Sequence, residues 1–182
     1  VPVDVWPGDA TIGRRLIAGD LEVGGESIPL TPKVWSGLMF RHGALWHDRA
    51  HDFSWMRDLR AVGGDQARQV GRALLMGWVV QNRVWDRHSW AVGVTARRLY
   101  HWLAFYSFFM DSARTQDQQR FFSSLSRQLT HLRRLMPRQQ MGLEGLLMAR
   151  TMLAAVPALG LGGAVLSQAV TMMSGCAVHV LN

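Results

Sequence analysis

Tryptophan and arginine recur at short spacing around residue 55 and again between residues 85 and 102. The members of this set are Trp55, Arg57, Arg60, Trp85, Trp90, Arg97, Arg98 and Trp102. Indole rings pack on the apolar faces of sugar rings, and guanidinium groups hold carboxylate or sulfate groups in bidentate fashion. A groove lined by both residue types therefore suits an acidic polysaccharide. The candidate substrate-binding residues are Trp55, Arg57, Arg97, Arg98 and Trp102.

Two other interpretations fit the same residues. Single-stranded nucleic acid offers bases that stack on aromatic rings and phosphates that arginine follows. Large aromatic side chains also pack helices against one another, with the arginines left at the surface. The residue types therefore leave a glycan site, a nucleic-acid site and a plain helical core open.

Arginine carries almost all of the positive charge. Nineteen arginines stand against one lysine, Lys33, and the formal net charge is +7 at pH 7. This balance favours an anionic partner, such as nucleic acid, acidic lipid or an acidic polysaccharide, although a solvated basic surface would give the same count. Apolar residues make up 48% of the 182 residues, a composition typical of a folded domain.

The seven histidines offer a weaker signal for chemistry. They are His42, His47, His51, His88, His101, His131 and His179. His47 and His51 are four residues apart and have Asp48 and Asp52 beside them, which would suit a zinc site on a helix, but no third ligand is evident. We therefore predict a polar loop there, with no metal and no cofactor. His179 follows Gly175 near the end of an apolar stretch and could face a cleft or be structural.

The pattern of apolar residues predicts an all-α fold around these residues. Residues 1–50 are expected to form an irregular arm with a short helix, capped by Asp9 or Thr11, and a small hairpin over residues 21–30. Residues 51–182 are expected to form a series of helices, with a connector from Asn82 to Ser89. In that part we expect a helix ending at Gly63-Gly64, a helix capped by Asp65, helices over about residues 92–112 and 115–136, and two apolar helices broken near Pro157.

The last part of the chain contains no charged residue from Thr151 to Asn182. A helix that spans a membrane needs about twenty uninterrupted apolar residues, and Pro157 and several glycines interrupt this stretch. We therefore expect core helices of a larger helical assembly and no membrane span. The one cysteine, Cys176, excludes an internal disulfide.

Several short motifs follow one another in a recognisable order. They are Trp6-Pro7-Gly8-Asp9, Gly24-Gly25, the run from Phe53 to Asp65, Trp85-Asp86, Arg97-Arg98, Trp102-Leu103, Arg127-Gln128 and His131-Leu132. This succession resembles the heparinase II/III-like polysaccharide lyases, across the N-terminal arm and the first part of their α/α toroid. The resemblance implies an incomplete toroid of antiparallel helix pairs. It also implies a C-terminal β-sandwich domain of the same parent chain, which these 182 residues lack.

The family's activity is eliminative cleavage of uronate-containing polysaccharides, so the resemblance implies an acidic polysaccharide as partner. Such cleavage needs a group that neutralises the uronate carboxylate and a Tyr or His that takes the adjacent proton. Relatives carry a Pro-Asp-Gly-Gly-His segment where this chain has the stretched sequence from Ser174 to His179, so the catalytic candidate is His179. Tyr100 and Tyr106 do not match the position of the family's catalytic tyrosine, which is expected beyond Asn182.

The sequence thus predicts the N-terminal fragment of a heparinase II/III-like lyase, inactive by itself because the site draws on two domains. The parent enzyme is expected to be periplasmic or secreted, although no signal peptide is visible. The alternative is a non-catalytic helical module that binds acidic glycan or nucleic acid, and of these two partners we expect the glycan. A purely structural helical domain is the third interpretation.

Overall fold

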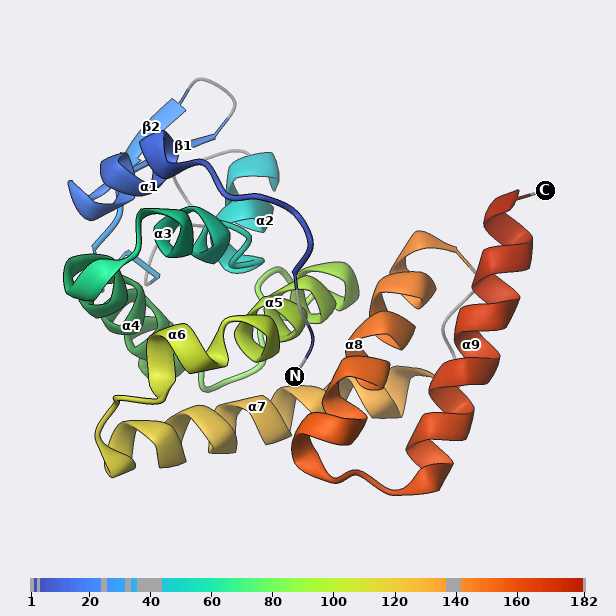
Figure 1. Cartoon of the computed structure of the whole chain (residues 1–182). Helices are drawn as coiled ribbons and strands as arrows, with labels where there is room; N and C mark the ends of the chain where they lie inside the picture. The colour runs from blue at the N-terminus through green and yellow to red at the C-terminus, as the bar shows by residue number, and fades with distance from the viewer. Residues whose placement is uncertain are drawn as a thin grey trace.

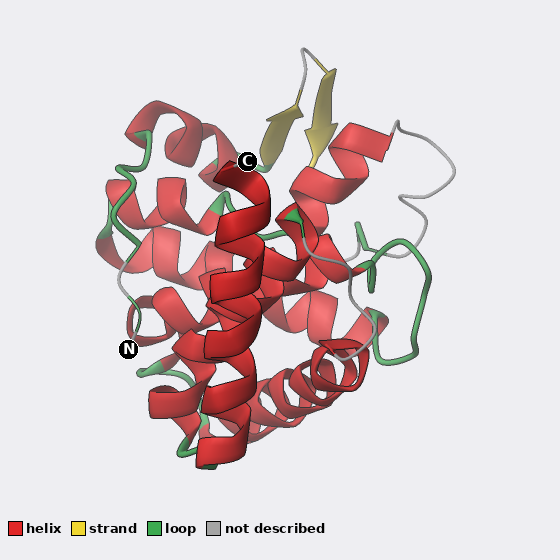
Figure 2. Ribbon diagram, turned by 90° about the vertical axis from the view of Figure 1, so that its right-hand side faces the viewer, coloured by secondary structure: helices red, strands yellow, loops and turns green. Residues whose placement is uncertain are grey.

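The computed structural model of the chain describes residues 2, 4–23, 26–31, 34–35, 44–136 and 142–181. This part is helical apart from one hairpin, so the all-α expectation is confirmed (Figures 1 and 2). The elements are α1 (Ala10–Ile17), β1 (Asp20–Val23), β2 (Glu26–Pro29), α2 (Ala44–His51), α3 (Met56–Val62), α4 (Gly64–Gln81), α5 (Val92–Ala104), α6 (Tyr106–Met110), α7 (Thr115–Leu135), α8 (Leu143–Leu159) and α9 (Gly163–Leu181).

The N-terminal elements pack directly on the helices that follow. The carboxylate of Asp9 caps α1 by accepting hydrogen bonds from the backbone N–H of Thr11, at 2.7 Å, and of Ile12. Helix α1 then crosses α3 at very short range, because Gly13 has no side chain. A Cβ atom at Gly13 would lie 2.2 Å from the carbonyl oxygen of Asp58. The expected arm is therefore joined to the helical part by close backbone packing.

We predict that Gly13→Ala lowers the free energy of unfolding by about 2–3 kcal/mol, because the new methyl group meets backbone that can move only if α1 and α3 separate. Gly162→Ala is the matched control, since a Cβ atom there has nothing within 4 Å. Urea unfolding of both variants, followed by circular dichroism, measures the difference. Equal stability of the two variants would contradict the close crossing.

Strands β1 and β2 pair antiparallel, with Leu21 opposite Ile28 and Glu22 opposite Ser27. The guanidinium of Arg15 bonds to both Asp20 and Glu22, which ties the hairpin to α1. The expected turn at Gly24-Gly25 lies outside the described residues.

Several predicted boundaries are wrong. Residues 44–51 form helix α2, although the sequence suggested irregular chain and a polar loop there. The helix expected over residues 92–112 is divided at Phe105 into α5 and α6. Gly63, with φ of 72°, is the N-cap of α4, and Asp65 lies in its first turn. The break expected near Pro157 is confirmed, because α8 ends at Leu159 before a left-handed Gly160 and α9 begins at Gly163.

The C-terminal helices form an antiparallel pair beside the rest of the molecule (Figure 1). Helix α8 packs along α9 on one side and along α5 on the other. Thr151 fixes the second contact, because its hydroxyl donates to the carbonyl oxygen of Ala96 at 2.7 Å. Helix α8 therefore brings its own polar residues next to those of α5.

Candidate functional site, an arginine cluster at the junction of three helices

The structure divides the candidate substrate-binding residues into two groups. Three of them are buried, with exposed fractions of 3% for Trp55, 0% for Arg98 and 1% for Trp102. Arg57 and Arg97 keep side chains that reach the surface, at 24% and 30% exposure. The expectation that all five line one groove is therefore corrected, because only the latter two can meet a ligand in this structure.

Trp55 and Trp102 are buried because they pack around Phe53. Its ring centroid lies 4.8 Å from that of Trp55 and 5.5 Å from that of Trp102, and Trp78 meets the same ring edge-on. Phe53 has a φ of 60°, an unusual value for a bulky residue, which directs its ring into the core between α2 and α3. Each such ring buries about 150–250 Å², so this cluster is the centre of the hydrophobic core.

Arg98 is a structural residue, because its guanidinium donates its hydrogen bonds to acceptors inside the protein. Its guanidinium donates to Oε1 of Gln128 at 2.8 Å and to the carbonyl oxygens of Ser89 at 2.8 Å and His51 at 3.1 Å. It also lies 4.0 Å above the ring of Trp78. Burial lowers the pKa of Arg98 well below its ordinary value, and the charge of Asp52 opposes this effect.

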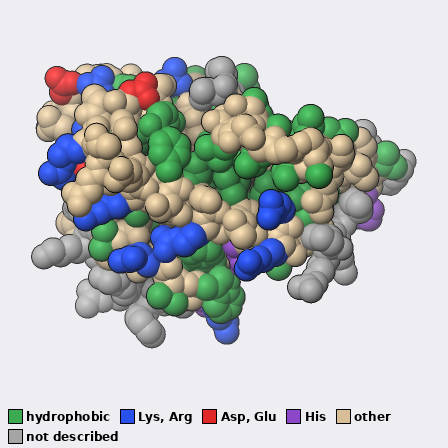
Figure 3. All heavy atoms as spheres, turned by 90° about the horizontal axis from the view of Figure 1, so that it is seen from below, with side chains coloured by type: hydrophobic (Ala, Val, Ile, Leu, Met, Phe, Trp, Pro, Cys, Tyr) green, Lys and Arg blue, Asp and Glu red, His purple; other side chains and the backbone are tan. Residues whose placement is uncertain are grey.

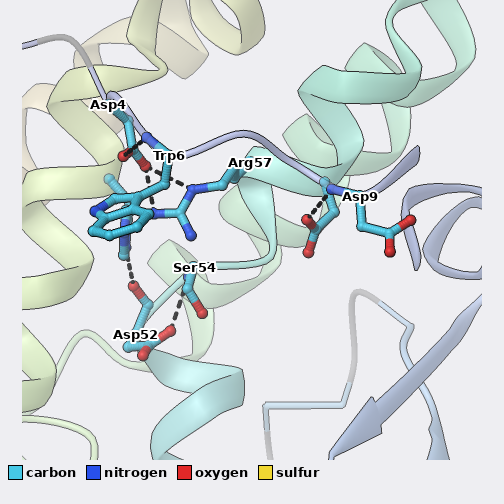
Figure 4. A network of polar contacts seen from close by, with 8 residues as sticks. Asp4, Trp6, Asp9, Asp52, Ser54 and Arg57 are labelled. Atoms are coloured by element: carbon cyan, nitrogen blue, oxygen red, sulfur yellow. Dashed lines mark hydrogen bonds and ion pairs between the residues drawn. The ribbon is translucent and has the colours of Figure 1, made fainter. Parts of the chain in front are cut away.

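Arg57 lies where the N-terminal segment that carries Asp4 and Trp6 crosses the helices (Figure 4). Arg97 lies on α5 and contacts Asp52, close to Ser54. The Nε and Nη2 atoms of Arg57 donate to one carboxylate oxygen of Asp4, at 2.9 and 2.6 Å. Nε of Arg97 lies 3.3 Å from a carboxylate oxygen of Asp52, whose other oxygen accepts from the backbone N–H of Ser54 at 2.8 Å. Each of these arginines therefore holds a carboxylate of the chain itself.

A third arginine, Arg150 of α8, joins them, and its role was not predicted from the sequence. Its guanidinium carbon lies 3.8 Å from the ring centroid of Tyr100 on α5. Burial lowers the pKa of Arg150; Asp4 opposes this, whereas Arg97 and Arg57 lower the pKa further. Its position as the last charged residue before the uncharged stretch was the available sequence signal.

The buried Nε of Arg150 has no hydrogen-bond partner within the described part of the chain. Buried N–H groups are rarely left without an acceptor, and a bound water or ion is one explanation for such a group. We name Arg57, Arg97 and Arg150 the arginine cluster. Helices α3, α5 and α8 supply one member each. Such a set of fixed, permanently charged forks is suited to hold carboxylate or sulfate groups.

Asp4 occupies the arginine cluster from a distant part of the sequence. Its side chain is 3% exposed, whereas the neighbouring Trp6 is 68% exposed. The second oxygen of Asp4 accepts from the backbone N–H of Trp6 at 3.2 Å. The carboxylate of Asp4 therefore binds Arg57 as the carboxylate of an acidic ligand would, with the exposed ring of Trp6 next to it in the sequence.

The described histidines of α2 and α5 make packing and hydrogen-bond contacts within the protein. The rings of His47 and His51 are stacked on α2 with centroids 4.2 Å apart, and Nε1 of Trp78 donates to Nδ1 of His51 at 2.8 Å. No group of three or more His, Cys, Asp or Glu side chains among the described residues could hold a metal ion. His101 is buried, with Nδ1 2.8 Å from the carbonyl oxygen of Asp52. His42 lies outside the described residues.

Buried histidines should make the protein sensitive to mild acid. Burial lowers the pKa of His51 and of His101 below the ordinary value, and the charges of His47 and Arg98 lower that of His51 further. The unfolded chain takes up protons below about pH 6.5 that the folded chain excludes, so stability falls as the pH falls. We predict a loss of about 2–3 kcal/mol in the free energy of unfolding between about pH 7.5 and about pH 5.5.

The variant His51→Asn checks this prediction, because an amide oxygen can accept from Trp78 without titrating. Urea unfolding at several pH values should show a smaller pH dependence in this variant than in the wild type, because His47, His101 and His131 keep their lowered pKa values. An unchanged dependence would mean that other groups are responsible.

The catalytic candidate His179 is exposed on α9. Helix α9 continues through Gly175 to Leu181, so His179 lies in a continuous helix rather than after a turn. The reason is that the apolar residues on both sides of Gly175 continue one helical pattern.

Comparisons with known proteins add nothing to these observations: no family model, curated protein or solved structure matches the chain. The resemblance to the heparinase II/III-like lyases therefore rests on the sequence motifs. Among the described helices, none is both long enough and apolar enough to cross a membrane.

Proposed function

We propose that the arginine cluster binds the carboxylate of a uronate residue in an acidic polysaccharide. The observations that carry this proposal are the pairing of Arg57 with the distant carboxylate of Asp4 and the unpartnered Nε–H of Arg150, which interacts electrostatically with both residues. An external carboxylate would take the place of Asp4. It would gain the free donor of Arg150 in addition to those of Arg57.

In an eliminative reaction, binding of the uronate carboxylate by these arginines would lower the barrier to proton removal as well as hold the substrate. Removal of the proton next to a uronate carboxylate places negative charge on that carboxylate, and fixed cations stabilise the charge as it develops. Arginine keeps its positive charge throughout such a step, so Arg57 and Arg150 would act as neutralising groups. The base that takes the proton is proposed to come from a tyrosine or histidine of the parent chain beyond residue 182.

The proposed parent protein is a heparinase II/III-like polysaccharide lyase with a periplasmic or secreted location. In this proposal α8 and α9, together with the helices before them, form the first part of an α/α toroid. The antiparallel packing of α8 on α9 and the all-helical architecture support this arrangement. A β-sandwich domain of the proposed parent protein would complete the site.

Absorbance of unsaturated uronate tests the lyase proposal. This chain and a chain extended downstream are incubated with heparan sulfate, alginate and hyaluronan. The proposal predicts a rise in absorbance with the extended chain and none with these 182 residues. No rise with either chain, together with retained binding of polyuronate, would leave the alternative of a non-catalytic glycan-binding module.

A further inference from the structure

A second basic surface lies away from the arginine cluster, between α4 and α7. Two adjoining hollows of about 770 and 510 Å³ share Val80 and Arg120, so they form one continuous groove. We call it the α4–α7 groove. Figure 3 views the side of the molecule on which α7 lies and shows several Arg side chains on it, with the acidic side chains gathered near one corner.

The charge of this groove is almost entirely positive. Its lining includes five arginines, namely Arg72, Arg83, Arg114, Arg120 and Arg127. Asp117 is the carboxylate among the lining residues, and it lies 3.0 Å from Nε of Arg114 and 3.9 Å from Arg120. No carboxylate among the described residues pairs with Arg83 or Arg127, so these two remain available to an anion.

The polar residues on α7 form a straight stripe. Gln116, Arg120, Ser123 and Arg127 follow one another at steps of three and four residues, which places them on one face of the helix. At 1.5 Å per residue this stripe is ~16 Å long. A linear polymer with anionic groups at regular intervals matches such a stripe better than a single small anion does.

The side chains around the groove favour a polysaccharide over nucleic acid. Proteins that bind single-stranded nucleic acid usually offer aromatic rings on which the bases stack. No aromatic side chain is among those that line the two hollows. Glutamine and serine instead provide donors and acceptors for sugar hydroxyl groups, and arginine binds sulfate or carboxylate groups in bidentate fashion.

We propose that the α4–α7 groove is a second binding site, which holds a run of an acidic polysaccharide outside the arginine cluster. The inference rests on the proposed function in taking the same polymer as the ligand. Helices α4 and α7 form the groove, together with Arg83 just after α4 and Arg114 just before α7. Helices α3, α5 and α8 carry the arginine cluster, so the two surfaces share no residue. A long chain that engages both would bind more tightly than a short one without any new contact.

The test compares Arg83→Ser/Arg127→Ser with the control Arg14→Ser/Arg49→Ser, which removes the same charge from exposed residues on α1 and α2. Calorimetric titration measures the Kd of long heparin, of unsulfated alginate of equal length and of a uronate disaccharide. We expect the groove variant to bind the long chains about tenfold more weakly. The slope of log K against log salt concentration should fall in magnitude by about two. Its Kd for the disaccharide should not change.

Equal losses of affinity in the groove variant and the control, or no loss in either, would contradict the proposal that the α4–α7 groove binds the polysaccharide. A loss with heparin alone would restrict its ligand to sulfated chains, whereas a loss with both polymers would extend it to carboxylates. If single-stranded DNA of equal charge displaces heparin, the ligand of the groove is nucleic acid and the polysaccharide proposal is wrong. If the disaccharide does not bind to the wild-type protein while the groove effect persists, the proposed function fails and the groove remains.

Discussion

Arg98→Met is expected to lower the free energy of unfolding by about 4 kcal/mol, the largest stability effect of a single substitution in this chain. The aliphatic part of arginine is retained, so little packing is lost. The lost guanidinium leaves the carbonyl oxygens of His51 and Ser89 and the amide oxygen of Gln128 in the core without their donor. Each buried acceptor without a partner costs about 1–3 kcal/mol.

Urea unfolding followed by tryptophan fluorescence measures this effect, because Trp78 lies against the guanidinium. Arg14→Met is the control, since Arg14 is exposed on α1 and should lose less than about 0.5 kcal/mol. A variant that no longer unfolds cooperatively would agree with the prediction. A loss below about 1 kcal/mol for Arg98→Met would show that these hydrogen bonds contribute little net stability.

Arg150→Gln is expected to weaken the binding of a uronate disaccharide about tenfold to a hundredfold, the largest effect on binding of a single substitution. The reason is that Arg150 supplies the one member of the arginine cluster whose buried N–H still lacks an acceptor. Fluorescence or calorimetric titration gives the Kd, and Arg49→Gln serves as a control of equal charge away from the site.

Asp4→Asn should act in the opposite direction. It removes the charge of the carboxylate that competes with the ligand for Arg57, so the apparent affinity for uronate should rise. Unchanged affinities in both the Arg150 and the Asp4 variants would place uronate binding elsewhere on the protein.

The sequence was most informative about elements with a long and regular apolar pattern. Helix α7 follows the predicted span closely, because its apolar positions recur without interruption and it ends just before Pro137. Helix α2 was not predicted because polar residues, including His47 and His51, lie on its buried face, so the apolar pattern of a helix is weak. That face packs against α5 and the aromatic core. The left-handed Phe53, which separates α2 from α3, has no local sequence signal.

The candidate site could be predicted only in part, for a physical reason. Adjacent arginines on one helix point in different directions, so Arg97 reaches the surface while Arg98 enters the core. The sequence alone does not show which of the two arginines is buried, because that depends on which face of α5 packs against the core. The contribution of Arg150 depends on the packing of α8 against α5, and that of Asp4 on the path of the N-terminal segment. Both are long-range contacts that local patterns do not encode.

Nuclear magnetic resonance of the arginine Nε–H groups tests the central claim most directly. The signals of Arg57, Arg97 and Arg150 are assigned with Arg→Lys variants and followed while a uronate disaccharide is added. The proposal predicts saturable shifts of these three signals at one common Kd, with the buried Arg98 unmoved. Shifts of the same size in exposed arginines such as Arg14, or no saturable shift in the arginine cluster, would contradict it.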